Sequence, residues 1–185
     1  MRRTAPRKDA QRNRARILAA ARAAFVAHGL GASTAAIARA ANLGTATLYR
    51  HFPTRPDLID AVFGEEVEHC LSLLAAAITV PDPWQGLSQA LEAVVDLELD
   101  APGLAGRIAG DQRSTPLLEH FNQRVRRDLA SLAERLRNVG AARSDLRGSD
   151  IAMLLTALRA VAMSDRNNAR RSTRRFIRLA IEGLR

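Results

Sequence analysis

The sequence is poor in cysteine and aromatic residues, and it has no long hydrophobic run. Cys70 is its one cysteine, which excludes an internal disulfide framework. No stretch of about 18 uninterrupted apolar residues occurs, and the first residues hold no hydrophobic signal core. We therefore expect a soluble, cytoplasmic protein without a membrane partner. Aromatic residues make up 4% of the chain, which disfavours an aromatic cage for a cationic ligand.

Sequence patterns for catalysis are absent as well. There is no Ser-His-Asp order, paired-carboxylate context, phosphate loop or HExxH motif. His69, Cys70 and His120 suggest a metal site, but neighbouring positions on a helix point about 100° apart and no further ligand lies at helical spacing. We expect no enzyme activity, no metal and no cofactor.

What the sequence does contain is helical periodicity. Nearly every segment repeats its apolar residues at helical spacing, and none alternates with period two. This pattern predicts an all-α fold of about nine helices. Gly29 is expected to end the first helix, Thr54 and Asp57 to open the fourth, and Ser149 to cap the eighth. The expected helices outside the segment 33–52 cover about 9–28, 54–78, 82–99, 101–110, 115–140, 150–164 and 170–184.

The segment from Ser33 to Phe52 predicts a helix, a tight turn and a short second helix. Asn42 tolerates the left-handed backbone of a tight turn, and Gly44 lets the next helix begin close by. In the second helix, 45–51, Leu48 is the inward anchor. The first residues of this helix leave small and hydroxyl side chains on its surface. Tyr49, Arg50 and His51 follow towards its end. Such a surface suits the major groove of DNA, where small residues approach base edges and longer ones reach phosphates.

The distribution of charge supports a nucleic-acid partner. Residues 1–55 hold eleven basic side chains and one acidic, whereas the remainder holds 17 basic and 18 acidic. An excess of this kind attracts a polyanion, although a solvated charge run is the alternative. A basic membrane-surface helix is disfavoured because the first residues lack an apolar face. We expect Arg2, Arg3, Arg7 and Lys8 to form an arm that contacts DNA of any sequence.

Several anchor residues stand at fixed spacing in the first 60 positions. They are Ile17-Leu18, Ala20-Ala21, Phe25, Gly29, Ile37-Ala38, Leu48-Tyr49, His51-Phe52, Arg55 and Leu58. These residues resemble the N-terminal signature of the TetR family of bacterial transcriptional repressors. Gly44 departs from it, because the family usually has a capping Ser there. The resemblance implies DNA contacts from Ser33, Thr45, Ala46, Thr47, Tyr49, His51 and Arg55, and the surface of the short helix adds Arg50.

The resemblance also implies two domains, a DNA-binding domain over 1–55 and a ligand-binding and dimerisation domain over 56–185. A small-molecule cavity is expected among the middle helices, where Arg107 and Asp111 would orient the ligand. The alternative for these two residues is a solvated loop. The alternative for Trp84 is that its ring only packs the start of a helix. The candidate ligand-binding residues are His69, Trp84, Leu87, Leu91, Arg107, Asp111, Phe121, Val125 and Met153.

The last two helices predict a two-fold interface. The helix over 150–164 is apolar around most of its circumference, and the helix over 170–184 carries one apolar stripe. Two copies of this pair would close as a four-helix bundle, as the resemblance also implies; a monomer core is the alternative. The candidate interface residues are Leu154, Leu158, Val161, Phe176, Ile177 and Ile181.

Together these features predict a homodimeric, nucleoid-associated repressor that binds double-stranded operator DNA. An unidentified small-molecule effector would release it from a palindromic operator. One alternative is a constitutive DNA-binding protein of the same fold without a ligand. The other is a small-molecule-binding or enzymatic helical bundle whose basic N-terminus serves solubility.

Overall fold

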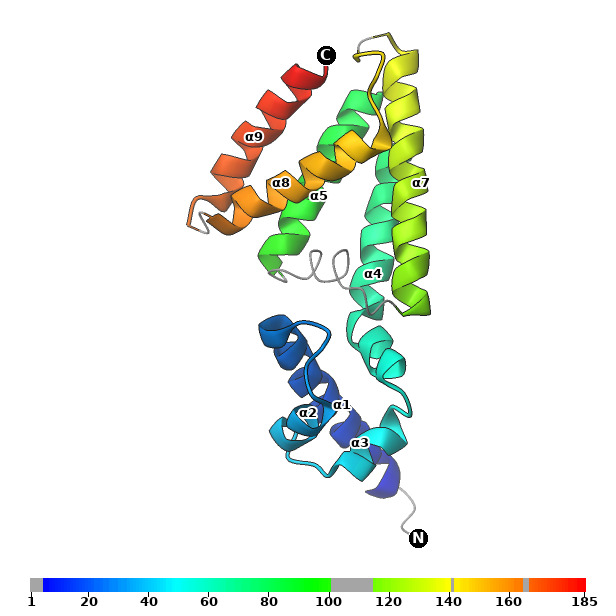
Figure 1. Cartoon of the computed structure of the whole chain (residues 1–185), viewed down its shortest axis with the longest axis vertical. Helices are drawn as coiled ribbons and strands as arrows, with labels where there is room; N and C mark the ends of the chain where they lie inside the picture. Colours follow the sequence, from blue (N-terminus) through cyan, green and yellow to red (C-terminus); the bar gives the residue numbers. More distant parts are fainter. Residues whose placement is uncertain (1–4, 101–114, 141, 165–166) are drawn as a thin grey trace. The chain divides into compact units, whose positions relative to one another are not determined.

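The computed structural model describes residues 5–100, 115–140, 142–164 and 167–185 (Figure 1). Within these ranges the chain forms eight helices and no strand, which confirms the predicted all-α fold. The helix expected over 101–110 lies outside the described residues. Among the described residues, none of the helices combines the length and the apolar composition that spanning a membrane requires.

The chain divides into two compact units. The first unit contains α1 (Ala5–His28), α2 (Thr34–Ala40), α3 (Thr45–His51), the first part of α4 (Arg55–Thr79) and the first residues of α7 (Pro116–Asn138). The second unit contains the rest of α4 and α7 together with the remaining helices. Helix α4 therefore contributes residues to both units.

The first unit is built around buried aromatic and aliphatic side chains. The rings of Phe25 and Phe63 lie 5.9 Å apart between centroids. Gly29 ends α1 with a φ of +74°, as the sequence predicts. The first turns of α4 close this core from one side. The fully buried larger side chains are Ile17, Phe25, Leu30, Ile37, Leu48, Phe52, Leu58, Ile59 and Phe63.

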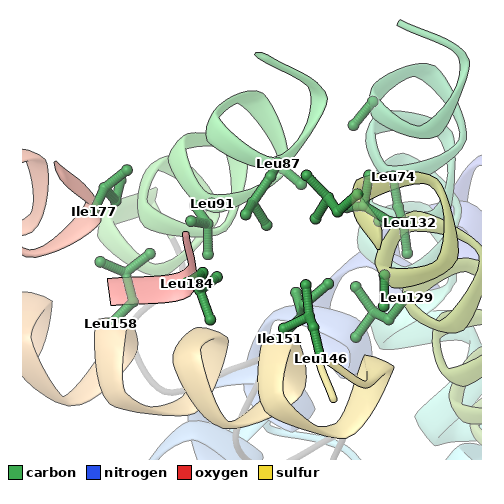
Figure 2. Packing of buried hydrophobic residues seen from close by; sticks show 14 of the residues in the cluster. Leu74, Leu87, Leu91, Leu129, Leu132, Leu146, Ile151, Leu158, Ile177 and Leu184 are labelled. Carbon is green, nitrogen blue, oxygen red and sulfur yellow. The ribbon is translucent and has the colours of Figure 1, made fainter. Parts of the chain in front are cut away.

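The second unit adds α5 (Pro83–Asp100), α8 (Gly148–Ser164) and α9 (Ala169–Leu184). Helix α8 packs against both α5 and α9. Helices α4 and α7 run side by side (Figure 1), and the Arg135 guanidinium ties them by donating to the Val80 carbonyl at 2.6 Å. The core side chains converge from all five helices (Figure 2); they include Leu74, Leu87, Leu91, Leu129, Leu132, Leu136, Ile151, Leu158, Ile177 and Leu184.

The helix starts follow capping chemistry, with one correction. Thr54 and Asp57 form the predicted reciprocal cap at the start of α4, with N–H to side-chain oxygen distances of 2.9 and 3.2 Å. Ser149 does not cap α8, because the helix begins at Gly148, two residues before the expected start, and Ser149 lies within its first turn. The Asp150 carboxylate accepts the Arg147 N–H at 2.8 Å instead. A side chain at Gly148 would place its Cβ 2.7 Å from the Ala130 nitrogen, so this start requires glycine.

Candidate functional site

The turn between α2 and α3 has the geometry that its sequence predicts. Asn42 has a φ of +52°, in the left-handed region. The N–H groups of Asn42 and Leu43 donate to the carbonyls of Arg39 and Ala38, both at 2.9 Å. Gly44 stands at the N-cap of α3 without a side-chain hydrogen bond, which is the consequence expected from a missing hydroxyl. The turn thus closes through its own backbone.

Helix α3 presents a polar surface beyond its buried anchor Leu48. Thr45, Ala46, Tyr49 and Arg50 are exposed, while Thr47 and His51 are half-buried. The side chain of Arg50 donates to the Thr47 hydroxyl at 3.1 Å. Tyr49 is 47% exposed, and its hydroxyl lies 3.3 Å from that of Thr34 at the start of α2. The beginning of α2 and the outer side of α3 therefore form one surface.

Ser33 borders this surface at the start of α2. It is exposed, and its hydroxyl caps α2 by accepting the Ala36 N–H at 3.4 Å. The cap predicted from the sequence is confirmed. The hydroxyl and the first N–H groups of α2 lie together at the edge of the surface, where a phosphate would meet several donors.

Arg55 behaves differently from the other predicted DNA-contacting residues. Its guanidinium donates to the carbonyls of Leu30 and Ala32, the latter at 2.6 Å, and lies 5.8 Å from the centre of the Phe25 ring. Arg55 thus fastens the segment between α1 and α2 to α4. A sequence pattern shows that a cation is present but not where it points, so this role was not predicted.

Other cations of the first unit also make internal contacts. Arg14 lies 4.6 Å over the Phe52 ring, Arg16 donates to the Asn42 carbonyl at 3.1 Å, and Arg22 donates to the Val62 carbonyl at 2.6 Å. Lys8, Arg12, Arg39 and Arg50 are exposed. Arg2 and Arg3 of the expected arm lie outside the described residues, and α1 begins at Ala5 rather than at 9. Arg14 is exposed as well, and Arg50 also donates to the Thr47 hydroxyl, so Lys8, Arg12 and Arg39 are the exposed cations of this unit for which no internal contact has been described.

The second unit encloses a cavity of about 290 Å³ among α4, α5, α7 and α8. Its walls are mainly aliphatic, and burial raises the pKa of the Cys70 thiol that lines it, so the thiol stays neutral at pH 7. The lining residues are Cys70, Leu73, Leu74, Ala90, Ala93, Val94, Phe121, Asn122, Val125, Arg126, Leu129, Ala152, Leu155, Thr156 and Arg159.

Of the candidate ligand-binding residues, Phe121 and Val125 line this cavity and the other described ones do not. Leu87 and Leu91 are buried in the helix core, because the cavity meets the neighbouring face of α5. Met153 is 63% exposed, and His69 is exposed beside the lining Cys70.

Two further expectations concern α5 and the segment after it. Trp84 is half-buried near the start of α5, and the Arg185 guanidinium lies 5.2 Å over its ring. Trp84 therefore packs the helix end, which is the alternative to a ligand contact. Arg107 and Asp111 lie outside the described residues. Four polar residues of the lining, Asn122, Arg126, Thr156 and Arg159, are not among the predicted site residues. The sequence signal that they carry is a polar ridge at helical spacing beside an apolar one.

The candidate interface residues separate into two groups. Leu158 and Ile177 are 0% and 5% exposed, and they belong to the core of the second unit. The expectation that they face a partner is therefore wrong, because α5 takes up that side of α8 and α9. Leu154, Val161, Phe176 and Ile181 are half-buried. Met153 and Leu179, at 63% and 54%, are the large apolar side chains that these two helices expose most among the described residues.

Comparison with known proteins agrees with this architecture. Residues 17–62 match the model of the bacterial regulatory proteins of the tetR family. A TetR transcriptional regulator from Streptomyces coelicolor is 30% identical over 93% of this chain and 98% of its own, with a TM-score of 0.57. A TetR transcription regulatory protein from Mycobacterium vanbaalenii is 28% identical over 97% and 98%, with a TM-score of 0.51.

A third structure, of RolR in complex with resorcinol, is 22% identical over 96% of this chain and 89% of its own and shares the fold, with a TM-score of 0.56. No curated protein matches the chain. A helix-turn-helix unit is typical of DNA-binding regulators of transcription. The likeness covers the signature helices and nearly the whole of a 30% identical relative. The chain belongs to the TetR family of bacterial transcriptional regulators, which bind operator DNA as dimers.

Proposed function

We propose that this regulator is a homodimeric repressor that leaves a palindromic operator when a small molecule fills the cavity of the second unit. The observation that carries the proposal is the double use of α4. Its Leu58 and Phe63 are buried in the first unit, whereas Cys70 and Leu74 line the cavity. A change in packing at the cavity end is therefore transmitted along one continuous helix to the unit that bears α3.

In this proposal α3 of each subunit lies in the major groove. Thr45, Ala46 and Thr47 are small enough for close approach to base edges at the start of the helix. Tyr49 and Arg50 reach phosphates, with Ser33 and His51 at the border of the surface. Arg55 acts as a positioning residue, since its guanidinium holds the segment before α2. The half-sites are spaced by about 34–36 Å, one helical turn, or by a small multiple of it.

The dimer forms through the outer faces of α8 and α9. Met153, Ala157 and Val161 follow one another at i, i+4 and i+8 on α8, and Phe176, Leu179 and Ala180 share a face of α9. Small residues among them allow two helix pairs to approach closely. An exposed patch of this kind is typical of an interface rather than of a solvated surface. In the proposed interface, Met153 and Leu179 take the place of the predicted contact residues Leu158 and Ile177, which lie in the core.

Release requires a ligand that prefers the operator-free state of the protein. A coupling of about 2–3 kcal/mol is enough for a 30- to 150-fold change in operator affinity. The aliphatic cavity supports a small-molecule effector, and so does the presence of resorcinol in the RolR structure. The effector's own affinity for the protein falls by the same factor when operator is bound.

The test combines DNA selection with a ligand screen. Duplexes selected from a random library by the full-length protein should share a palindrome, and compounds that raise the melting temperature should then release the selected duplex in a gel shift. Selection without any shared sequence would contradict the recognition of an operator. Compounds that stabilise the protein and leave the duplex bound would contradict release and favour a constitutive DNA-binding protein.

A further inference from the structure

We propose that the cavity accepts an amphipathic molecule with an anionic head group and an aliphatic body of medium length. The Arg126 and Arg159 guanidinium groups bind the head, and the inner walls hold the body. This inference rests on the proposed function, because it names the chemical class of effector for the same cavity.

The inner walls of the cavity are apolar on every helix that forms them. Leu74, Ala90 and Leu129 are buried, and Leu74 and Leu129 belong to the helix core shown in Figure 2. Val94, Phe121, Val125 and Leu155 are half-buried around them. An aliphatic chain against these walls gains about 0.8 kcal/mol for each buried methylene group.

Polar side chains of the lining lie on the more exposed ridges of α7 and α8. Asn122 and Arg126 are four residues apart on α7, and Thr156 and Arg159 are three apart on α8, so each pair shares one helix face. Arg126 and Thr156 are exposed, and Asn122 and Arg159 are half-buried. The Thr156 hydroxyl donates to the Ala152 carbonyl at 3.0 Å, so the N–H donors of the rim belong to Asn122, Arg126 and Arg159. The cavity therefore has an apolar interior and a polar rim, which suits a molecule polar at one end.

The charge of the lining selects the sign of the head group. It contains two guanidinium groups, and none of the described lining residues is acidic. The Cys70 thiol adds no negative charge, because burial keeps it protonated at neutral pH. The nearest carboxylate along α7, Asp128, is buried and bound by both oxygens to Arg124, at 2.9 and 3.1 Å, and does not line the cavity. An anion is therefore preferred over a cation.

The size of the cavity limits the length of the body. A volume of about 290 Å³ lies at the lower end of the range of about 300–1,000 Å³ that is usual for ligand sites. A medium-length chain fits this volume, whereas a ligand near the upper end of that range does not.

Decanoate, 1-decanol and decyltrimethylammonium test the proposal, since they share a ten-carbon chain and differ in the charge of the head. Cys70, the one cysteine of the sequence, reports occupancy through protection from alkylation by iodoacetamide, and calorimetry gives the affinities. We expect decanoate to bind about tenfold or more tightly than 1-decanol, and the ammonium compound most weakly. Equal binding of decanoate and 1-decanol, or no protection of Cys70 by any of the three, would overturn the proposal.

Matched variants locate the head group. Arg126→Gln and Arg159→Gln should each weaken decanoate by about tenfold and leave the affinity for 1-decanol unchanged. Arg127→Gln is the control, because it removes the same charge from the next residue of α7, whose side chain is 70% exposed and does not line the cavity. If Arg159→Gln does not fold, Arg126→Gln decides alone. Loss of affinity in the Arg127 variant alone, or in none, would contradict the assignment.

Failure of this inference is distinguishable from failure of the proposed function. Decanoate that binds with the expected head-group preference but leaves the operator bound would support the ligand class and contradict release. A different compound that protects Cys70 and releases the operator, while decanoate does not bind, would support release and contradict the ligand class.

Discussion

At the scale of the residue, the arginines of the first unit differ in how far they are engaged by their own unit, and exposed Arg14 and Arg50 both make such a contact. Arg14, Arg16, Arg22 and Arg55 contact rings and carbonyls of their own unit. Arg12, Arg39 and Arg50 are exposed. The basic composition of this segment predicts a polyanion partner, but it does not predict this difference. The direction of a long side chain depends on carbonyls brought near by tertiary packing, which a local pattern does not contain.

Arg55→Ala should lower the free energy of unfolding by about 1–3 kcal/mol, because two loop carbonyls lose a charged donor. Arg39→Ala should leave unfolding in urea unchanged and weaken binding to DNA of any sequence. Circular dichroism in urea and a fluorescence anisotropy titration measure the two effects. An Arg55→Ala variant that is as stable as the wild type but defective in DNA binding would contradict this structural role and support a direct contact between Arg55 and DNA.

Two glycines inside helices should respond in opposite ways to alanine. At Gly148 a Cβ would lie 2.7 Å from the Ala130 nitrogen, so Gly148→Ala should destabilise the protein by about 1–3 kcal/mol. At Gly64 it would lie 4.0 Å from the side chain of Leu117, and Gly64→Ala should stabilise α4 by up to about 1 kcal/mol. Thermal melts of both variants measure these changes. Equal shifts of the melting temperature in the two variants would contradict the difference in packing.

At the scale of the element, the helices could be predicted well and their faces only in part. Asn42, the cap at Thr54 and the bounds of α3 follow from local backbone chemistry, and the structure confirms them. The cavity and the interface do not follow in this way. Periodicity identifies the apolar stripes that contain Leu91 and Leu158. It does not show that these stripes lie in the helix core, whereas Ala90 and Val94 beside Leu91 line the cavity.

The α9 surface offers a matched test of the interface. Leu179→Glu should yield a monomer, because it places a charge in the proposed contact between helix pairs. Arg178→Glu changes the neighbouring exposed residue, which lies about 100° away around the helix, and should remain a dimer. Sedimentation at several concentrations distinguishes the two. A Leu179→Glu variant that sediments as the wild type would move the interface to another face.

At the scale of the whole molecule, the excess positive charge of the sequence lies in residues 1–55, which bear α3, and residues 56–185 are nearly balanced. The resemblance to the TetR signature could be recognised from the sequence because its anchors are local. The effector class could not, because the cavity is assembled from four helices whose lining residues are spread from Cys70 to Arg159.

Deletion of residues 1–8 tests the basic arm, which remains a prediction from the sequence. Each lost phosphate contact should reduce the slope of log affinity against log salt by about 0.9, and binding to random and selected duplexes should weaken alike. Titrations at several salt concentrations measure this slope. An unchanged slope and affinity would remove these residues from the DNA contact.

The most direct test of the account compares a palindromic duplex with a single half-site in an anisotropy titration of wild type and Thr47→Ala. The wild type should bind the palindrome at least about 100-fold more tightly than the half-site, because two copies of α3 engage together. Thr47→Ala should lose affinity for the palindrome by about 1–3 kcal/mol and retain its binding to random DNA. Equal affinity of the wild type for palindrome, half-site and random duplex would contradict recognition of an operator by paired α3 helices.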